Sequence, residues 1–213
     1  MFLIGIDPVA LGLVASLSRP GGNVTGITDL TTELGPKQLE ILHQLVPSAR
    51  RIALLVNPSN PNAETLSREL AAAARILGLE IHVLRASNEH DLDMISTTVP
   101  ELRIAGLVIG TDALFNSYSQ QLAKLAADHS LPSIHTLRQF PAAGGLMSYG
   151  GGLMDGYRQA GVYCGRVLKG EKPSDLPVRQ ATKFELVINL STARALDIDM
   201  PATLLARADE VIE

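Results

Sequence analysis

The sequence predicts an α/β fold with doubly wound parallel sheets, and three observations carry this prediction. Apolar runs of strand length alternate with longer segments of helical periodicity along most of the chain. Residues 51–57 are almost continuously apolar, as in a parallel strand that is covered on both faces. Asp, Asn, Thr and Gly residues follow the predicted strands, which is typical of loops that lead from a strand into a helix.

The first part of the chain predicts strands that lead into capped helices. Asp7-Pro8 supplies an N-cap and a favoured first residue for a helix, and Asn60-Pro61 repeats that pattern. Gly78 fits the C-cap of the helix that starts near Asn60. The elements expected here are a strand at 2–6, a helix at 9–17, an extended segment at 23–28, a helix at 32–45, a strand at 51–57 and a helix at 60–77.

The alternation of strands and helices then continues to the C-terminus, but it becomes less regular after residue 144. The middle of the chain predicts a strand at 80–84, a helix at 91–99, a strand at 104–110, a helix at 116–129 and a strand at 133–136. The last third predicts a strand at 145–148, a helix at 153–168, an extended stretch through Pro173 and Pro177, a strand at 184–190 and helices at 192–196 and 202–211.

The composition indicates a folded α/β protein and excludes several functions. Of 213 residues, 46% are apolar and 19% are charged, which is enough for one large or two small domains with a buried core. A net charge of -4 without a basic stripe, together with 4% aromatic residues, argues against a nucleic-acid partner.

The residues that usually carry cofactor or catalytic chemistry are scattered. The five histidines show no paired spacing and Cys164 is the single cysteine, so we expect no metal site and no intrachain disulfide. We interpret His135, at a strand end, as a satisfied structural residue. Dinucleotide and Walker-type fingerprints are absent, and no nucleophile, base and orienting group assemble. We therefore expect no cofactor, no catalytic residue and no enzymatic activity.

The apolar opening of the chain differs from an export signal. No Lys or Arg precedes it, Asp7-Pro8 interrupts it, and no cleavage site with a polar mature start follows. No apolar run reaches the roughly 20 residues that span a bilayer. The chain as given is therefore expected to be cytoplasmic.

Polar residues gather where four predicted strands end. In a parallel sheet these loops share one edge, where side chains and helix N-terminal amides converge on a ligand. For Asp7 and Asn60, capping alone is an equally good interpretation, and Tyr149 can be a ligand-stacking residue or a plain rim tyrosine. The candidate ligand-binding residues are Asp7, Asn57, Asn60, Thr111, Asp112 and Tyr149.

Five segments carry a family resemblance. They are DPVALGLVASLSRPGGNVTG at 7–26, LVNPSNPN at 55–62, AGGLMSYG at 143–150, TKFELVINL at 182–190 and LLARADEVIE at 204–213. Over essentially its whole length the chain resembles bacterial ABC-transporter substrate-binding proteins of the tryptophan/tyrosine type. The resemblance implies a type I periplasmic-binding-protein-like architecture, in which two α/β lobes hold a ligand in the cleft between them.

The resemblance also implies a domain division. Residues 1–24 and 145–172 correspond to an incomplete lobe one, and residues 25–144 and 173–213 to lobe two, with the docking of 191–213 left open. An incomplete lobe exposes a sheet edge, so self-association through that edge is expected.

The function that the resemblance implies is capture of a small ligand, an amino acid or related carboxylate, for the permease of an ABC importer. Asp7 is then expected to meet a ligand ammonium, and the backbone amides after Asn60 a carboxylate. Members of the family are periplasmic or lipid-anchored outside the cytoplasm. The alternative is a cytosolic ligand-sensing module of a regulator with the same fold.

Overall fold

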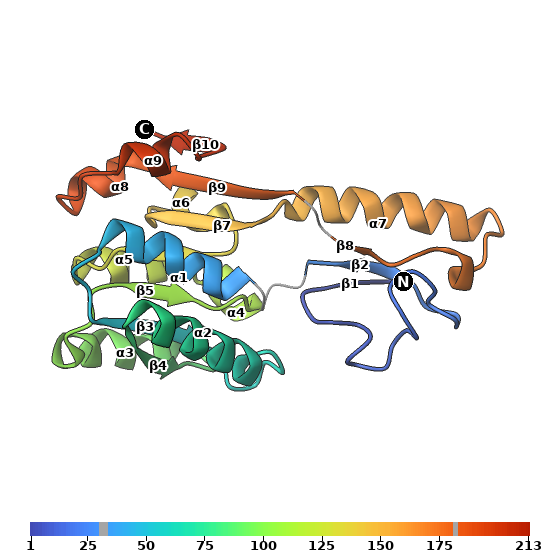
Figure 1. Ribbon diagram of the computed structural model, residues 1–213, viewed down its shortest axis with the longest axis horizontal. Coiled ribbons are helices and arrows are strands. Elements are labelled where there is room, and N and C mark those ends of the chain that lie inside the picture. Colours follow the sequence, from blue (N-terminus) through green and yellow to red (C-terminus); the bar gives the residue numbers. More distant parts are fainter. Residues whose placement is uncertain (30–33, 181–182) are drawn as a thin grey trace. The chain divides into compact units, whose positions relative to one another are not determined.

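The computed structural model describes residues 1–29, 34–180 and 183–213, and it divides the chain into two compact units. The smaller unit comprises Met1–Thr32 and Gly151–Phe184, and the larger one Glu33–Gly150 and Glu185–Glu213. Figure 1 shows the course of the chain through both.

The larger unit is built on a seven-stranded sheet with the strand order β10-β9-β7-β6-β5-β3-β4. The pairings of β3 with β4 and β5, of β6 with β5 and β7, and of β9 with β10 are parallel. Its strands are β3 (Arg51–Val56), β4 (Glu80–Arg85), β5 (Leu107–Ile109), β6 (Ser133–His135), β7 (Met147–Gly151), β9 (Phe184–Asn189) and β10 (Glu210–Ile212).

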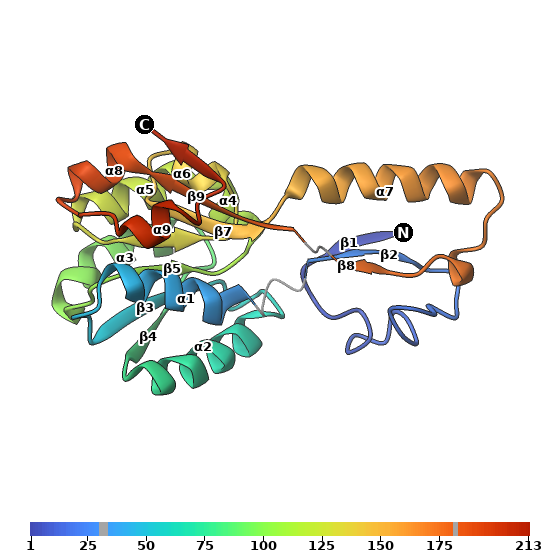
Figure 2. The same ribbon diagram turned by 45° about the horizontal axis from the view of Figure 1, so that its top comes forward.

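Helices cover both faces of this sheet, so the predicted doubly wound arrangement is confirmed. Along β3, Ile52 and Leu54 belong to one apolar cluster, and Ala53 and Leu55 belong to the other. Helices α1 and α2 pack side by side (Figure 2). The helices of the unit are α1 (Leu34–Leu45), α2 (Ala63–Leu77), α3 (Glu89–Leu102), α4 (Ala113–Ser117), α5 (Ser119–Asp128), α6 (Gln139–Ala142), α8 (Leu190–Ala195) and α9 (Ala202–Leu205).

The smaller unit consists of a three-stranded parallel sheet and one long helix. The strand order is β1-β2-β8, with β1 at Phe2–Ile4, β2 at Gly26–Thr28 and β8 at Arg179–Gln180. Helix α7 (Leu153–Leu168) contacts β1 and β2, and the short 3₁₀ helix η2 covers Pro173–Asp175. Gly26 lies so close to β1 that a Cβ there would come within 2.2 Å of the Phe2 carbonyl oxygen, so the strand pairing requires glycine.

Two predicted helices are wrong. Residues 9–17 form turns instead of a helix, because Gly12 adopts a left-handed conformation with φ 69° and the exposed side chains of Val9, Leu11 and Leu13 alternate instead of forming one helical face. The predicted helix at 202–211 stops at Leu205, and Glu210–Ile212 forms β10 beside β9.

Other boundaries differ in detail. Helix α2 begins at Ala63 with Asn62 at its N-cap, whereas the sequence suggested Asn60. The predicted start of a helix at residues 32–33 lies outside the described residues. Helix α7 has the predicted bounds, and Gly78 is the left-handed C-cap of α2, as expected.

The two units also divide the chain differently from the boundaries that the family resemblance implies. Residues 25–29 go with the smaller unit because β2 pairs with β1, and 173–180 because β8 pairs with β2. Residues 145–150 go with the larger unit because β7 pairs with β6. Residues 191–213 dock on the larger unit.

Candidate ligand-binding site

The loops after β3 and β5 are tied together by Asp112. Its Oδ1 accepts a hydrogen bond from Asn57 Nδ2 (3.1 Å) and its Oδ2 accepts one from Asn60 Nδ2 (2.8 Å). The same carboxylate caps α4, because the Leu114 N–H donates to Oδ1 (2.9 Å). The sequence placed these residues at one sheet edge, and the parallel pairing of β3 with β5 brings them together.

Asn57 and Asn60 also shape the β3–α2 loop. Asn57 Oδ1 accepts from the Ser59 N–H (3.0 Å), and Asn60 Oδ1 accepts from the Asn62 N–H (2.9 Å). The Asn60 amide group donates additionally to the Thr111 carbonyl oxygen (3.1 Å). Asn60 is therefore a crosslink between two loops instead of the N-cap of α2.

A second group of hydrogen bonds joins the ends of β5, β6 and β7. Gln38 Nε2, on α1, donates to the carbonyl oxygen of Tyr149 (2.9 Å) and to Thr136 Oγ1 (3.1 Å). Thr136 Oγ1 lies 2.5 Å from Thr111 Oγ1. Gln38 is 3% exposed and Thr136 5%, so this part of the network is shielded from solvent.

Sequence reasoning missed Gln38 and Thr136, although each left a signal. Gln38 occupies a buried position of α1 between Leu34 and Leu42, where an apolar residue is the usual choice. Thr136 follows β6 in the same way that Thr111 follows β5.

Gly150 is required where β7 passes Thr136. A Cβ at residue 150 would lie 2.3 Å from the Thr136 carbonyl oxygen and 2.5 Å from its Cγ2. The glycine allows the close approach of the backbone that brings Tyr149 to Gln38.

Tyr149 and Asp7 differ from the other candidates. Tyr149 is half-buried and packs against the apolar cluster that includes Leu42 and Leu66. Asp7 belongs to the smaller unit, where its exposed carboxylate accepts a hydrogen bond from the Val9 N–H (2.9 Å). Within the larger unit, the network thus connects Asn57, Asn60, Thr111, Asp112 and the backbone of Tyr149.

The hollow at this edge is small. It is lined by Asn57, Asn60, Thr111, Asp112 and neighbouring apolar side chains, and its volume is about 10 Å³. That is the size of a single water site, so this hollow alone does not enclose an amino acid.

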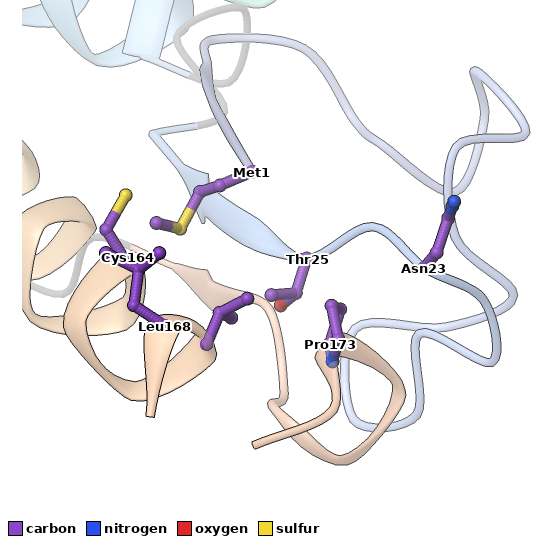
Figure 3. Close-up of a pocket in the computed structure, with 7 residues that line it drawn as sticks. Met1, Asn23, Thr25, Cys164, Leu168 and Pro173 are labelled. Atoms are coloured by element: carbon purple, nitrogen blue, oxygen red, sulfur yellow. The ribbon is translucent and has the colours of Figure 1, made fainter. Parts of the chain in front are cut away.

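A larger pocket lies within the smaller unit. It measures about 260 Å³, and its lining is mostly apolar, with Met1, Cys164, Leu168 and Pro173 around it (Figure 3). The hydroxyl of Thr25, which also lines it, already donates to the Leu176 carbonyl oxygen (2.6 Å). The pocket therefore offers few polar groups for recognition.

His135 is a buried histidine next to the network. Its Nδ1 accepts a hydrogen bond from the Leu137 N–H (3.2 Å), and its ring lies 5.8 Å from that of Phe140, centroid to centroid. Within the described part of the chain, its Nε2 makes no well-formed hydrogen bond, although the Gly110 backbone interacts with the ring. Burial lowers the pKa of His135 from 6.5 to about 4, and the ring is therefore neutral at pH 7.

The described residues form neither a metal-binding cluster nor a membrane-spanning helix. Among residues 1–29, 34–180 and 183–213, His, Cys, Asp and Glu form no group of three that could hold a metal ion. Over the same ranges, no helix combines the length and the apolar character that crossing a bilayer demands.

The fold is that of an α/β protein with polar side chains gathered at one edge of a parallel sheet. The sequence matches the family described as ABC transporter substrate binding protein over residues 1–212, and the chain belongs to that family. Periplasmic sugar-binding proteins at 14% identity or less share the type I periplasmic-binding-protein fold alone.

Three proteins are similar to the chain over most of its length. A protein named "Tyrosine-binding protein" from Clostridioides difficile (strain R20291) is 32% identical over 197 residues, which cover 90% of this chain and 55% of that protein. An ABC domain from Streptococcus pneumonia, solved in complex with L-Trp, has a TM-score of 0.83 at 28% identity, over 97% of this chain and 70% of that one. A conserved domain protein from Vibrio cholerae has a TM-score of 0.87 at 27% identity, over 96% of this chain and 68% of that one.

The chain is shorter than these proteins. It spans 55% of the length of the Clostridioides difficile relative.

Proposed function

We propose that the chain is the ligand-binding part of an ABC importer and that its ligand is an aromatic amino acid. The observation that carries this proposal is the hydrogen-bonded edge of the larger unit, where Asn57 follows β3, Thr111 follows β5 and Tyr149 lies near the end of β7 in the same sheet. The relative named for tyrosine binding and the similar domain solved with L-Trp support the choice of ligand.

The chemistry of the edge suits a zwitterion with an aromatic side chain. Amide and hydroxyl groups offer hydrogen bonds to charged ligand groups, and the half-buried ring of Tyr149 offers an apolar surface for stacking.

We propose further that the chain binds without catalysis. In the described part of the chain, the hydroxyls of Thr111 and Thr136 hydrogen-bond to each other, Thr136 also accepts from Gln38, and no histidine or thiol accepts from either hydroxyl. A hydroxyl nucleophile needs such a base, so the edge supports recognition better than group transfer.

The partner of the loaded chain is then the permease of the importer, outside the cytoplasm, as membership of this family suggests. A ligand-sensing module of a regulator is the alternative. The distant neighbour described as a LacI transcriptional regulator is 13% identical and supports the fold alone, so no observation favours that function.

A thermal-shift screen tests the proposal. With tyrosine or tryptophan at a hundred times Kd, we expect the Tm to rise by about 5 to 10 °C, because a ligand that binds only the folded state stabilises it by mass action. Glucose and ribose serve as controls and should leave the Tm unchanged. A shift with sugars but not with aromatic amino acids would contradict the proposed ligand class.

We also propose that copies of the chain associate through the smaller unit. Its strand β1 lies at one edge of the sheet, and α7 exposes Met154 (77%), Tyr157 (57%) and Leu168 (87%). Light scattering at tens of micromolar should show a mass above 22.7 kDa. A monomer at every concentration would rule this out.

A further inference from the structure

We infer that the Thr111 hydroxyl donates a hydrogen bond to the carboxylate of the ligand, and that Gln38 and Thr136 fix the direction of this donor. The inference rests on the proposed function and assigns a role within that same site. The observations behind it are the hydrogen bonds that the polar atoms at the edge already make.

The contact with Tyr149 fixes the orientation of the Gln38 amide. The carbonyl oxygen of Tyr149 can only accept, so the group that contacts it at 2.9 Å is the Gln38 nitrogen. The other proton of that nitrogen is directed at Thr136 Oγ1, 3.1 Å away. Thr136 Oγ1 is therefore an acceptor toward Gln38.

The proton of Thr136 then has one destination. Thr136 is 5% exposed, and among the described residues the acceptor within reach is Thr111 Oγ1, at 2.5 Å. The opposite direction would leave the Thr136 proton buried without an acceptor, which is the costlier arrangement. Thr136 therefore donates to Thr111.

Gln38, Thr136 and Thr111 thus form a hydrogen-bond relay in which each group donates to the next. The hydroxyl proton of Thr111, the last group, is available to a ligand. Its side chain is partly exposed, and it contributes to the small hollow with Asn57 and Asn60. In the described part of the chain, its hydroxyl makes no hydrogen bond except that with Thr136. A hydroxyl that accepts one hydrogen bond also donates a stronger one, so the relay strengthens Thr111 as a donor.

Most other polar groups at the edge are occupied. Both protons of the Asn60 amide are used, by Asp112 and by the Thr111 carbonyl. The Asn62 N–H donates to Asn60 Oδ1 and the Ala63 N–H to the Asn60 carbonyl oxygen (3.0 Å). The first amides after Asn60 are thus engaged within the loop, which makes Thr111 the better donor for a carboxylate.

The identity of the ligand group follows from the chemistry of tryptophan. Its ammonium and indole N–H groups can only donate, so its carboxylate oxygens are the acceptors for a hydroxyl donor. The negative charge of Asp112, next to Thr111, would repel a ligand carboxylate. The Asp112 carboxylate, however, already accepts hydrogen bonds from Asn57, Asn60 and the Leu114 N–H, which offset that repulsion.

The experiment compares L-tryptophan with tryptamine, which lacks the carboxylate. The chain contains no Trp, so indole fluorescence reports the ligand alone. We expect Thr111→Val to weaken L-tryptophan binding about 10- to 100-fold, as for the loss of a hydrogen bond to a charged group, and Thr111→Ser to bind within about 3-fold of wild type. Tryptamine binding should change less than about 3-fold in Thr111→Val, because that ligand lacks the acceptor.

Thr136→Val tests the positioning role. It should weaken L-tryptophan binding about 3- to 10-fold, and the double variant with Thr111→Val should bind no more weakly than Thr111→Val alone, because the two hydroxyls act in series. Thr136→Ser keeps the hydroxyl and should restore wild-type affinity.

Three outcomes would overturn the inference. Wild-type affinity of Thr111→Val for L-tryptophan would exclude the contact, and equal weakening for tryptamine would place the hydroxyl against another ligand group. Additive effects of the two valine substitutions would exclude the relay. If the wild-type chain binds neither tryptophan nor tyrosine, the proposed function itself fails, and that result is distinct from the others.

Discussion

Acidification from pH 7 to pH 4 should lower the free energy of unfolding by about 3 kcal/mol through His135 alone. Burial lowers the pKa of His135 from 6.5 to about 4 in the folded chain. Between these two values the unfolded state binds more protons than the folded state does. The contribution of the neutral ring is therefore fully present above pH 6.5 and is lost as the pH falls toward 4.

Urea unfolding at a series of pH values measures this effect. His135→Asn keeps an acceptor for the Leu137 N–H and removes the titrating ring, so its stability should depend less steeply on pH than that of the wild type. His90→Asn, at an exposed position, is the matched control and should follow the wild-type curve. Parallel curves for the wild type and His135→Asn would show that His135 does not control the acid lability.

The second large effect is expected from Asp112→Ala. This substitution removes the acceptor of three hydrogen bonds and the N-cap of α4. We expect it to destabilise the chain by about 2 to 3 kcal/mol, from a lost cap together with donors left without an acceptor at a partly exposed site. It should also weaken ligand binding, since the loops after β3 and β5 lose the side chain that joins them.

Denaturant unfolding together with ligand titration checks this prediction. Asp128→Ala is the matched control, because Asp128 is exposed and, among the residues that the structure describes, pairs only with Lys124 on the same helix (2.5 Å). Such a pair contributes about 0.5 kcal/mol or less. If Asp112→Ala is no less stable than Asp128→Ala, Asp112 does not organise the two loops.

The sequence predicted the fold well where signals agreed. The helix predicted at 153–168 has the bounds of α7, and Gly78 is the predicted C-cap of α2. It misled where a local signal acted alone. Asp7-Pro8 resembles a helix start, but a left-handed Gly12 and alternating apolar residues give turns there instead. Residues 210–212 became a strand because β9 offers them an edge, which is a tertiary effect.

The candidate site, like the fold, was predicted only in part. Asn57, Thr111 and Asp112 could be predicted from their places after β3 and β5, because parallel pairing brings the ends of these strands together. Gln38 could not be predicted in this way, since it reaches the edge from α1 and its role depends on the packing of that helix over β5 and β6. The hydrogen-bond count that distinguishes Thr111 from Asn60 likewise needs the folded geometry.

The most direct test of the account is a titration of L-tryptophan and L-tyrosine into the chain by isothermal calorimetry, with glucose as the control. The account predicts saturable binding of an aromatic amino acid with a stoichiometry of one ligand per chain, and no heat from glucose. Absence of binding to both amino acids, or binding of glucose in their place, would contradict it.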